Sequence, residues 1–137
     1  MANMLVVDDE ARYRQQIQRL LERENHVVET AVDGGDALDI CRRFQPDVLI
    51  VDWMLRDPLN GLDLATLLHD QTPRLAIILI TGYPATQLHE FLREREWQAR
   101  VLEKPFELND LRNLIAWALD ARGSAENGQI ADAASAS

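Results

Sequence analysis

Residues 48–52 read Val48-Leu49-Ile50-Val51-Asp52, four consecutive apolar residues closed by a carboxylate. A short apolar run of this kind, rich in β-branched residues, is typical of a strand buried on both faces of a sheet. Similar runs occur at four other places in the chain: residues 4–7, 27–31, 76–80 and 101–102. Together the runs predict a five-stranded sheet that is covered on both sides.

Between and after these runs, apolar residues recur at the spacing of one helix face. The first such stripe consists of Tyr13, Ile17, Leu20 and Leu21. Four more stripes lie within residues 37–41, 64–68, 88–92 and 111–118. Because one helix follows each strand, we expect right-handed crossovers between parallel strands. The pattern predicts a three-layered α/β fold.

The chain has 137 residues, which suits one domain with a substantial core. Its net charge of −9 disfavours direct binding to nucleic acid or to anionic membranes. A single cysteine excludes an internal disulfide, and no apolar run reaches the roughly 20 residues of a membrane span. We expect a cytoplasmic protein with a domain at residues 1–121. Residues 122–137 are mainly small and polar, which predicts a flexible tail or a truncated linker.

Polar residues stand at the ends of four of the five apolar runs. Asp8 and Asp9 follow the first run, Asp52 closes the third, Thr81 follows the fourth and Lys104 the fifth. In a parallel α/β sheet the carboxyl ends of the strands open on one edge, where ligands bind. Carboxylates without His or Cys suit Mg²⁺, and the hydroxyl and ammonium groups can bind phosphate oxygens. The sequence therefore predicts a phosphoryl-binding site in which one carboxylate could act as the nucleophile.

These residues, in this order and each at the end of its own run, resemble the receiver domain of two-component response regulators. The motifs that carry the resemblance are Asp8-Asp9-Glu10, Asp52, Thr81-Gly82 and Lys104-Pro105-Phe106. The resemblance covers about residues 3–121 and implies a CheY-like, flavodoxin-like (βα)5 doubly wound fold with strand order 2-1-3-4-5. It also implies that a histidine kinase or a phosphotransfer protein donates the phosphoryl group and that contacts with a downstream protein then change.

By this resemblance Asp52 is the phosphoacceptor and Mg²⁺ is the cofactor. Asp9 matches the direct metal ligand, Asp8 matches the residue that holds metal-bound water, and the backbone carbonyl of Met54 matches a further ligand. The expected chemistry is self-phosphorylation and self-dephosphorylation only, so the domain is not expected to be an enzyme. Bulky side chains at Met54 and Tyr83, beside the path of the attacking water, predict slow self-dephosphorylation.

Thr81 and Lys104 match the two groups that contact the phosphate in the family. The Lys104–Pro105 bond matches one that is cis in receivers, an isomer accessible chiefly to proline. Val101 occupies the position of the usual aromatic switch residue. We therefore expect Tyr83, rather than Val101, to carry any aromatic switching.

Two alternative hypotheses stay open at this point: a receiver-like binding module that works without phosphorylation, and a receiver fragment of a longer regulator or hybrid kinase. An aspartyl phosphohydrolase is disfavoured, because that class carries Asp-x-Asp after its first strand and this chain reads Asp8-Asp9-Glu10. The expected partners are a histidine kinase or phosphotransfer protein and a downstream protein. The resemblance also allows a homodimer through the region of the fourth and fifth helices.

Overall fold

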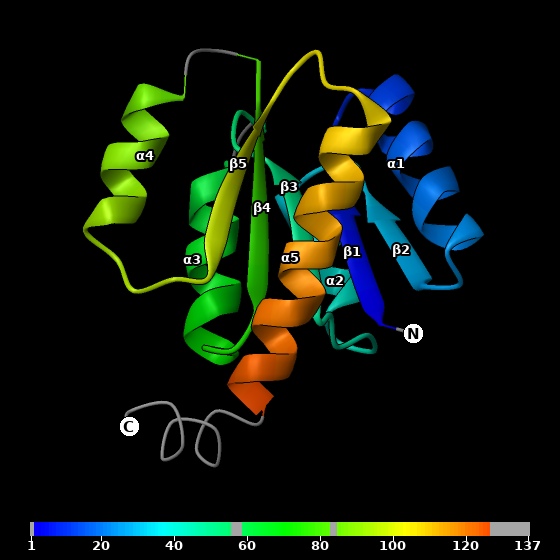
Figure 1. The fold of residues 1–137 in the computed structure, drawn as a ribbon. Helices are drawn as coiled ribbons and strands as arrows, with labels where there is room; N and C mark the ends of the chain where they lie inside the picture. Colours follow the sequence, from blue (N-terminus) through cyan, green and yellow to red (C-terminus); the bar gives the residue numbers. More distant parts are fainter. Residues whose placement is uncertain (1, 56–58, 83–84, 127–137) are drawn as a thin grey trace.

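The chain alternates strand and helix five times, as the apolar runs predict (Figure 1). The structure is a computed structural model that describes residues 2–55, 59–82 and 85–126, without the side chains of residues 122–126. The strands are β1 (Asn3–Val7), β2 (Val27–Ala31), β3 (Val48–Asp52), β4 (Ala76–Thr81) and β5 (Ala99–Glu103). The helices are α1 (Ala11–Arg23), α2 (Gly34–Ile40), α3 (Gly61–Gln71), α4 (Thr86–Arg93) and α5 (Leu108–Glu126).

The five strands form a parallel sheet in the order β2-β1-β3-β4-β5, which confirms the predicted doubly wound topology. The register brings the strand ends together. Val7 of β1 pairs with Val51 of β3, and Asp52 pairs with Ile80 of β4. The residues that end or follow β1, β3 and β4 therefore lie along one edge of the sheet.

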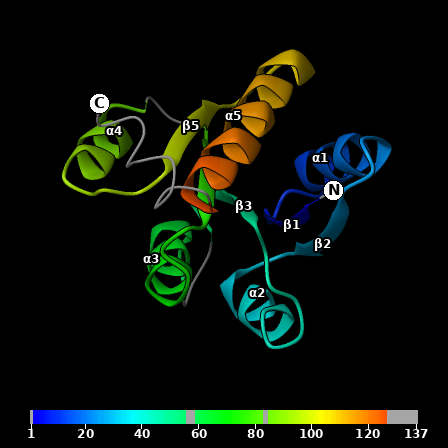
Figure 2. The same ribbon diagram turned by 60° about the horizontal axis from the view of Figure 1, so that its bottom comes forward.

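Helices cover both faces of the sheet, α1 and α5 on one side and α2, α3 and α4 on the other (Figure 2). Strand β3 shows how the sequence divides between the two cores. Val48 and Ile50 pack in the core beneath α1 and α5, whereas Leu49 and Val51 pack in the core beneath the other three helices. This alternation follows from the two-residue period of a strand, and burial on both faces explains why β3 is continuously apolar.

The edge strands are less buried than the sequence pattern predicts. Every residue of β3 and β4 is buried, but β2 and β5 each have a single buried residue, and Val27 is 44% exposed. Each edge strand has a neighbouring strand on one side only and lies at the rim of the helical layers. Burial on both faces is therefore a property of the central strands.

Helix α5 continues beyond Ala121, where composition predicts the end of the domain, to Glu126. A composition of small and polar residues does not by itself stop a helix, because each added residue gains one backbone hydrogen bond once the helix is established. The predicted tail thus begins within the last turns of α5. Residues 127–137 lie outside the described residues.

Candidate functional site

The polar residues predicted from the strand ends converge at the carboxyl edge of the sheet. Asp8 and Asp9 follow β1, while Asp52 and Thr81 are the last residues of β3 and β4. Lys104 follows β5, whose Glu103 pairs with Thr81. Since the strands are parallel and in register, residues far apart in the sequence meet at this edge.

The site contains a cluster of four carboxylates. One oxygen from each of Asp8, Asp9, Glu10 and Asp52 lies within 4.8 Å of the others. Asp8 and Asp52 are buried, with 0% and 5% of their surface exposed, whereas Glu10 is exposed. The cluster therefore reaches from the interior of the sheet edge to the surface.

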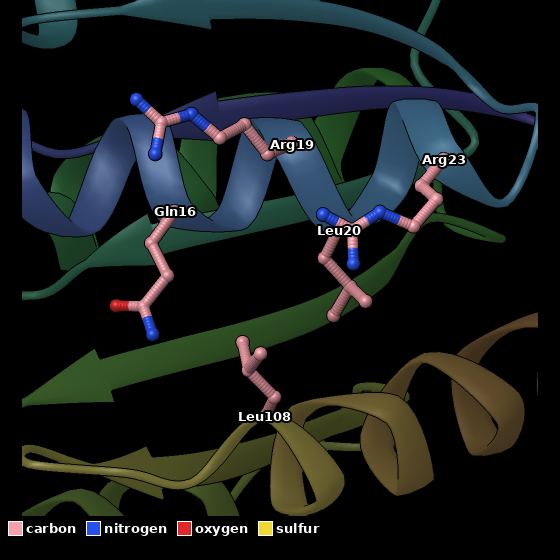
Figure 3. Close-up of a pocket in the computed structure, with 5 residues that line it drawn as sticks. All are labelled: Gln16, Arg19, Leu20, Arg23 and Leu108. Atoms are coloured by element: carbon pink, nitrogen blue, oxygen red, sulfur yellow. The ribbon is translucent and has the colours of Figure 1, made fainter.

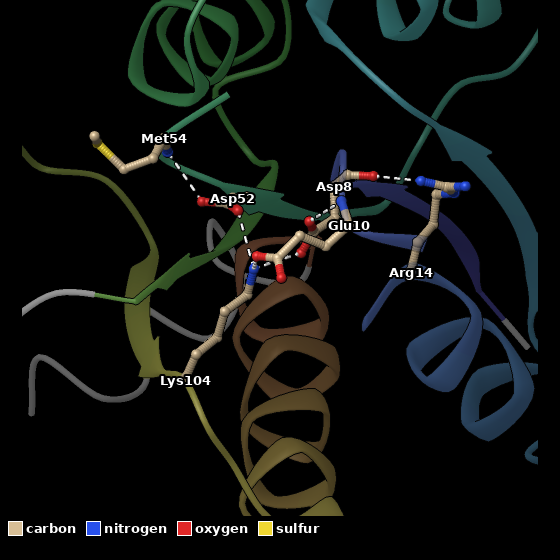
Figure 4. Close-up of polar contacts among 6 residues, drawn as sticks. All are labelled: Asp8, Glu10, Arg14, Asp52, Met54 and Lys104. Atoms are coloured by element: carbon tan, nitrogen blue, oxygen red, sulfur yellow. Dashed lines mark hydrogen bonds and ion pairs between the residues drawn. The ribbon is translucent and has the colours of Figure 1, made fainter. Parts of the chain in front are cut away.

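The ammonium group of Lys104 lies among these carboxylates (Figure 4). Its Nζ is 2.8 Å from Glu10 Oε1, 3.0 Å from Asp52 Oδ2 and 3.1 Å from Asp8 Oδ2. Burial by itself lowers the pKa of Lys104, but hydrogen bonds to Glu10 and Asp52 outweigh burial, so the pKa lies above its usual value. Lys104 is consequently a fixed positive charge at neutral pH.

Backbone amides orient the two buried carboxylates. Met54 N–H donates to Asp52 Oδ1 at 2.9 Å, and Glu10 N–H donates to Asp8 Oδ1 at 2.8 Å. Arg14 of α1 donates to the backbone carbonyl of Asp8 at 2.7 Å, as Figure 4 also shows. The conformation of the segment after β1 and the position of Asp52 are therefore fixed by local hydrogen bonds.

The surroundings of Asp8 disfavour the ionised form of its carboxyl group. Burial raises the pKa of its carboxyl, and repulsion from Asp52 raises it further, although the Glu10 N–H and Lys104 act in the opposite direction. Its Oδ2 lies 3.1 Å from Lys104 Nζ, yet within the described residues it has no hydrogen bond of good geometry. This buried oxygen is thus able to accept a further cation.

The donor set fits Mg²⁺. All the clustered groups are carboxylates, the oxygen ligands that this ion prefers, and the separations of up to 4.8 Å are close to the span of one octahedral ion or its bound waters. Three of the clustered carboxylates share the single ammonium of Lys104, so negative charge exceeds positive charge among these groups. Among the described residues, these acidic groups are the ones that could hold a metal ion.

The remaining predicted residues lie around this cluster. Thr81 is buried, and its backbone carbonyl accepts a hydrogen bond from Lys104 N–H at 2.7 Å. The Lys104–Pro105 peptide bond is cis. Val101 is half-buried in β5 and pairs with Leu79, while Tyr83 lies outside the described residues.

Two residues that contact Lys104 were not predicted to belong to the site. Glu10 belongs to the Asp8-Asp9-Glu10 motif, which predicts no role for it, and the helical stripe predicts that Tyr13 is a core residue. The Tyr13 ring centroid lies 4.3 Å from Lys104 Nζ. Both residues are separated from Lys104 by some ninety positions in the sequence, so no local pattern reveals either contact.

The hollows on the surface of the described residues include the following two. One, of about 280 Å³, is beside the acidic cluster and is lined by Trp53, Met54, Leu55, Asn60 and Leu62. The other, of about 150 Å³, lies between α1 and the start of α5 (Figure 3) and is lined by Gln16, Arg19, Leu20, Arg23 and Leu108. No carboxylate of the cluster lines the second hollow, so it adds nothing to the chemistry of the acidic site.

Comparison with known proteins identifies the family in which this fold and this site occur together. A family model described as the response regulator receiver domain matches residues 4–116. The chain is 37% identical over 84 residues to TcrX of Mycobacterium tuberculosis, described as a probable transcriptional regulatory protein, covering 61% of this chain and 36% of TcrX. It is 31% identical over 83 residues to the photosynthetic apparatus regulatory protein RegA of Cereibacter sphaeroides, covering 61% of this chain and 45% of RegA. The chain thus spans less than half the length of these relatives.

Solved structures share the same fold. A CheY-like receiver domain protein from Methanospirillum hungatei superposes with a TM-score of 0.81 at 26% identity, covering 91% of this chain and 98% of that chain. NtrX from Brucella abortus superposes with a TM-score of 0.85 at 28% identity, covering 93% of this chain and 29% of NtrX.

The fold and the acidic edge define a signalling domain of two-component systems. More particularly, the chain belongs to the response regulator receiver domain family. None of the described helices combines the length and the apolar character needed to cross a bilayer.

Proposed function

We propose that this receiver domain accepts a phosphoryl group on Asp52. The observation that carries the proposal is the convergence of Lys104 Nζ on carboxylates at the ends of two separate strands, 3.0 Å from Asp52 Oδ2 and 3.1 Å from Asp8 Oδ2. The hydrogen bond from Met54 N–H to Asp52 Oδ1 fixes the acceptor before any donor arrives. A preoriented carboxylate beside a fixed cation is suited to receive an anionic group.

In the proposed reaction, a carboxylate oxygen of Asp52 attacks the phosphorus of a phosphohistidine on a histidine kinase or phosphotransfer protein. The new O–P bond forms as the N–P bond breaks, and the imidazole leaves with the electron pair of that bond. Lys104 then turns from Asp52 to the phosphoryl oxygens, and the Thr81 hydroxyl donates to another of these oxygens. We propose a cytoplasmic location for the domain.

We further propose that Asp8, Asp9, Asp52 and the backbone carbonyl of Met54 hold one Mg²⁺ ion. Bound at this edge, Mg²⁺ would supply positive charge for the transferring phosphoryl group. The fit rests on the four clustered carboxylates and on the Asp8 oxygen that has no well-formed hydrogen bond among the described residues.

The output of phosphorylation is proposed to be a change in the population of two arrangements of the α4 region. Thr81 ends β4, directly before the segment that leads into α4. Leu88 is the buried residue of this short helix, so few apolar contacts hold it in place. Since Val101 is not aromatic, Tyr83 is the proposed aromatic switch. A downstream protein or a second copy of the domain would then bind the face that α4, β5 and α5 form.

The proposal is tested by incubating the protein with Mg²⁺ and acetyl phosphate and recording its intact mass. We expect the mass of one phosphoryl group to be added, and this adduct to be lost in Asp52→Asn and after chelation of Mg²⁺. Asp47→Asn is the matched control, because Asp47 lies at the opposite edge of the sheet and precedes β3. Absence of an adduct, both with acetyl phosphate and with a phosphorylated histidine phosphotransfer domain, would favour a binding module that works without phosphorylation.

A further inference from the structure

The aromatic ring of Tyr13 lies against Lys104, the cation of the acidic site. Lys104 Nζ is 4.3 Å from the ring centroid, within the range of a cation–π contact. Tyr13 belongs to the first turn of α1 and is 8% exposed. In its helical stripe Tyr13 resembles an ordinary core residue, but its ring lies against a charged group.

Neighbouring side chains hold this ring in place. The Phe106 ring is 5.5 Å from the Tyr13 ring in a tilted arrangement, and the Arg12 guanidinium is 4.8 Å from the same centroid. Phe106 stands two residues after Lys104. Tyr13 therefore connects α1 to the segment that carries the lysine.

The contact with Tyr13 differs in kind from the other contacts of Lys104. The carboxylates of Asp8, Glu10 and Asp52 hold the ammonium through oxygen atoms. Under the proposed function, a metal ion would bind carboxylate oxygens of this cluster, and the phosphoryl group would form a bond to one oxygen of Asp52. The face of the Tyr13 ring offers no oxygen to either of them, so this contact can persist when the other contacts change.

We propose that Tyr13 is a positioning residue for Lys104: its ring holds the ammonium at the acidic site while the ammonium exchanges carboxylates for the phosphoryl group. This inference rests on the proposed function. Lysine has a flexible four-carbon stem, and without the ring the side chain would sample many rotamers once its carboxylate partners are engaged elsewhere. The lysine side chain is 7% exposed, a setting in which cation–π contacts are stronger than in water.

The first test is the rate at which acetyl phosphate phosphorylates Asp52. We expect Tyr13→Leu to lower the rate by about tenfold and Tyr13→Phe, which keeps the ring, to restore it. In a Lys104→Met background, Tyr13→Leu is expected to cause no further loss. The matched control is Trp117→Leu, which removes another aromatic partner of a cation, 4.7 Å from Arg100, between β5 and α5. An unchanged rate in Tyr13→Leu, or an equal loss in both backgrounds, would overturn the inference.

The second test does not depend on phosphorylation. By NMR, the ε-methylene protons of Lys104 are expected to show an upfield ring-current shift in the wild type and in Tyr13→Phe, but not in Tyr13→Leu. The shift is expected to persist after addition of Mg²⁺ and beryllium fluoride, which mimics the phosphoryl group. If the wild type is never phosphorylated, the proposed function fails, and the ring-current shift still decides the Tyr13 contact. A shift that is absent in the wild type, or that vanishes on adding Mg²⁺, contradicts the inference.

Discussion

At the amino ends of the strands polar groups pair with one another, whereas at the carboxyl ends carboxylates outnumber cations. At the amino edge, Asn3 N–H donates to Asp47 Oδ2 at 2.8 Å, and the Asn3 side chain donates to the carbonyl of Gln45 at 3.1 Å. Gln45 donates in turn to the Thr72 hydroxyl at 3.1 Å. At the carboxyl edge, three carboxylates share the ammonium of Lys104. Folding therefore pairs the polar groups of the amino edge with one another. The carboxyl edge keeps an excess of negative charge, which a bound cation would neutralise.

The largest expected effect is a loss of folding stability when a side chain is added at Gly61, which lies against the backbone of the carboxyl edge. A Cβ at Gly61 would lie 2.1 Å from the backbone oxygen of Asp52 and 2.4 Å from Trp53 Cα. Because backbone atoms cannot move aside locally, Gly61→Ala is expected to lower the free energy of unfolding by about 3 kcal/mol or more. Denaturant titration measures the change.

Gly82→Ala is the matched control for Gly61→Ala. Gly82 follows β4 at the same edge, and no atom that the structure describes, apart from its chain neighbours, lies within 4 Å of a Cβ placed there. We expect its stability to change by less than about 1 kcal/mol. If the two alanine variants are equally stable, the close approach of Gly61, at the start of α3, to the backbone of Asp52 is not what fixes this edge.

The second expected effect concerns competition between Lys104 and Mg²⁺ for the same carboxylates. Lys104→Met removes the ammonium from the acidic cluster, so Mg²⁺ is expected to bind about tenfold more tightly, although phosphorylation becomes slower. Calorimetry measures the affinity, and Asp47→Asn, at the amino edge, is expected to leave it unchanged. Weaker Mg²⁺ binding in Lys104→Met would show that the ammonium does not compete with the ion.

Replacing an aspartate by asparagine is expected to change the free energy of unfolding in opposite directions at the carboxyl edge and at the amino edge. Without Mg²⁺ at pH 7, Asp8→Asn is expected to raise the free energy of unfolding by about 1 kcal/mol, because burial disfavours the ionised Asp8 carboxyl. Asp47→Asn is expected to lower it by about 0.5–1 kcal/mol, because its hydrogen bond to Asn3 N–H loses the charged acceptor.

The effect of Asp8 depends on pH. Its pKa is higher in the folded state than its unfolded value of 3.8, so protonated Asp8 favours folding. Its contribution to stability is complete below pH 3.8 and is lost as the pH rises through the folded-state pKa. The advantage of Asp8→Asn is therefore expected to disappear when unfolding is measured near pH 4. An advantage that is the same at both pH values would mean that the ionisation of Asp8 is not its cause.

The central part of the fold could be predicted from the sequence because each buried strand is an uninterrupted apolar run. The run from Val48 to Val51 predicts β3, which extends one residue further to Asp52, since the positions of a strand covered on both faces are mainly apolar. The edge strands are less buried than their apolar runs predict, because β2 contains Glu29 and Thr30 and lies, like β5, at the rim of the helical layers. Strand order came from the resemblance to receivers, since local patterns do not contain it.

The predicted acidic edge follows from one rule, that parallel strands open their carboxyl ends together. That rule places Asp8, Asp52 and Lys104 near one another, but it does not state which side chains touch. For this reason, the sequence does not predict that Glu10 and Tyr13 contact Lys104. Their contacts with Lys104 depend on where α1 begins and on how the chain leaves β5, and these are features of the assembled structure.

The smallest expected effect concerns access of water to the phosphorylated carboxyl edge. Met54 is 50% exposed, and its backbone N–H donates to Asp52, so this residue lies next to the acceptor and its side chain is open to solvent. An amide at this position can hold a water molecule that thioether carbon atoms exclude. Met54→Asn is therefore expected to speed self-dephosphorylation by about three- to tenfold, which corresponds to about 1 kcal/mol of activation free energy.

The decay of the phosphorylated intact mass after removal of the donor measures the rate of self-dephosphorylation. Leu67→Asn, at an apolar residue of α3 that is 41% exposed, is expected to leave the rate unchanged. A wild-type lifetime of seconds that Met54→Asn does not shorten would show that this side chain does not control water at the acidic edge.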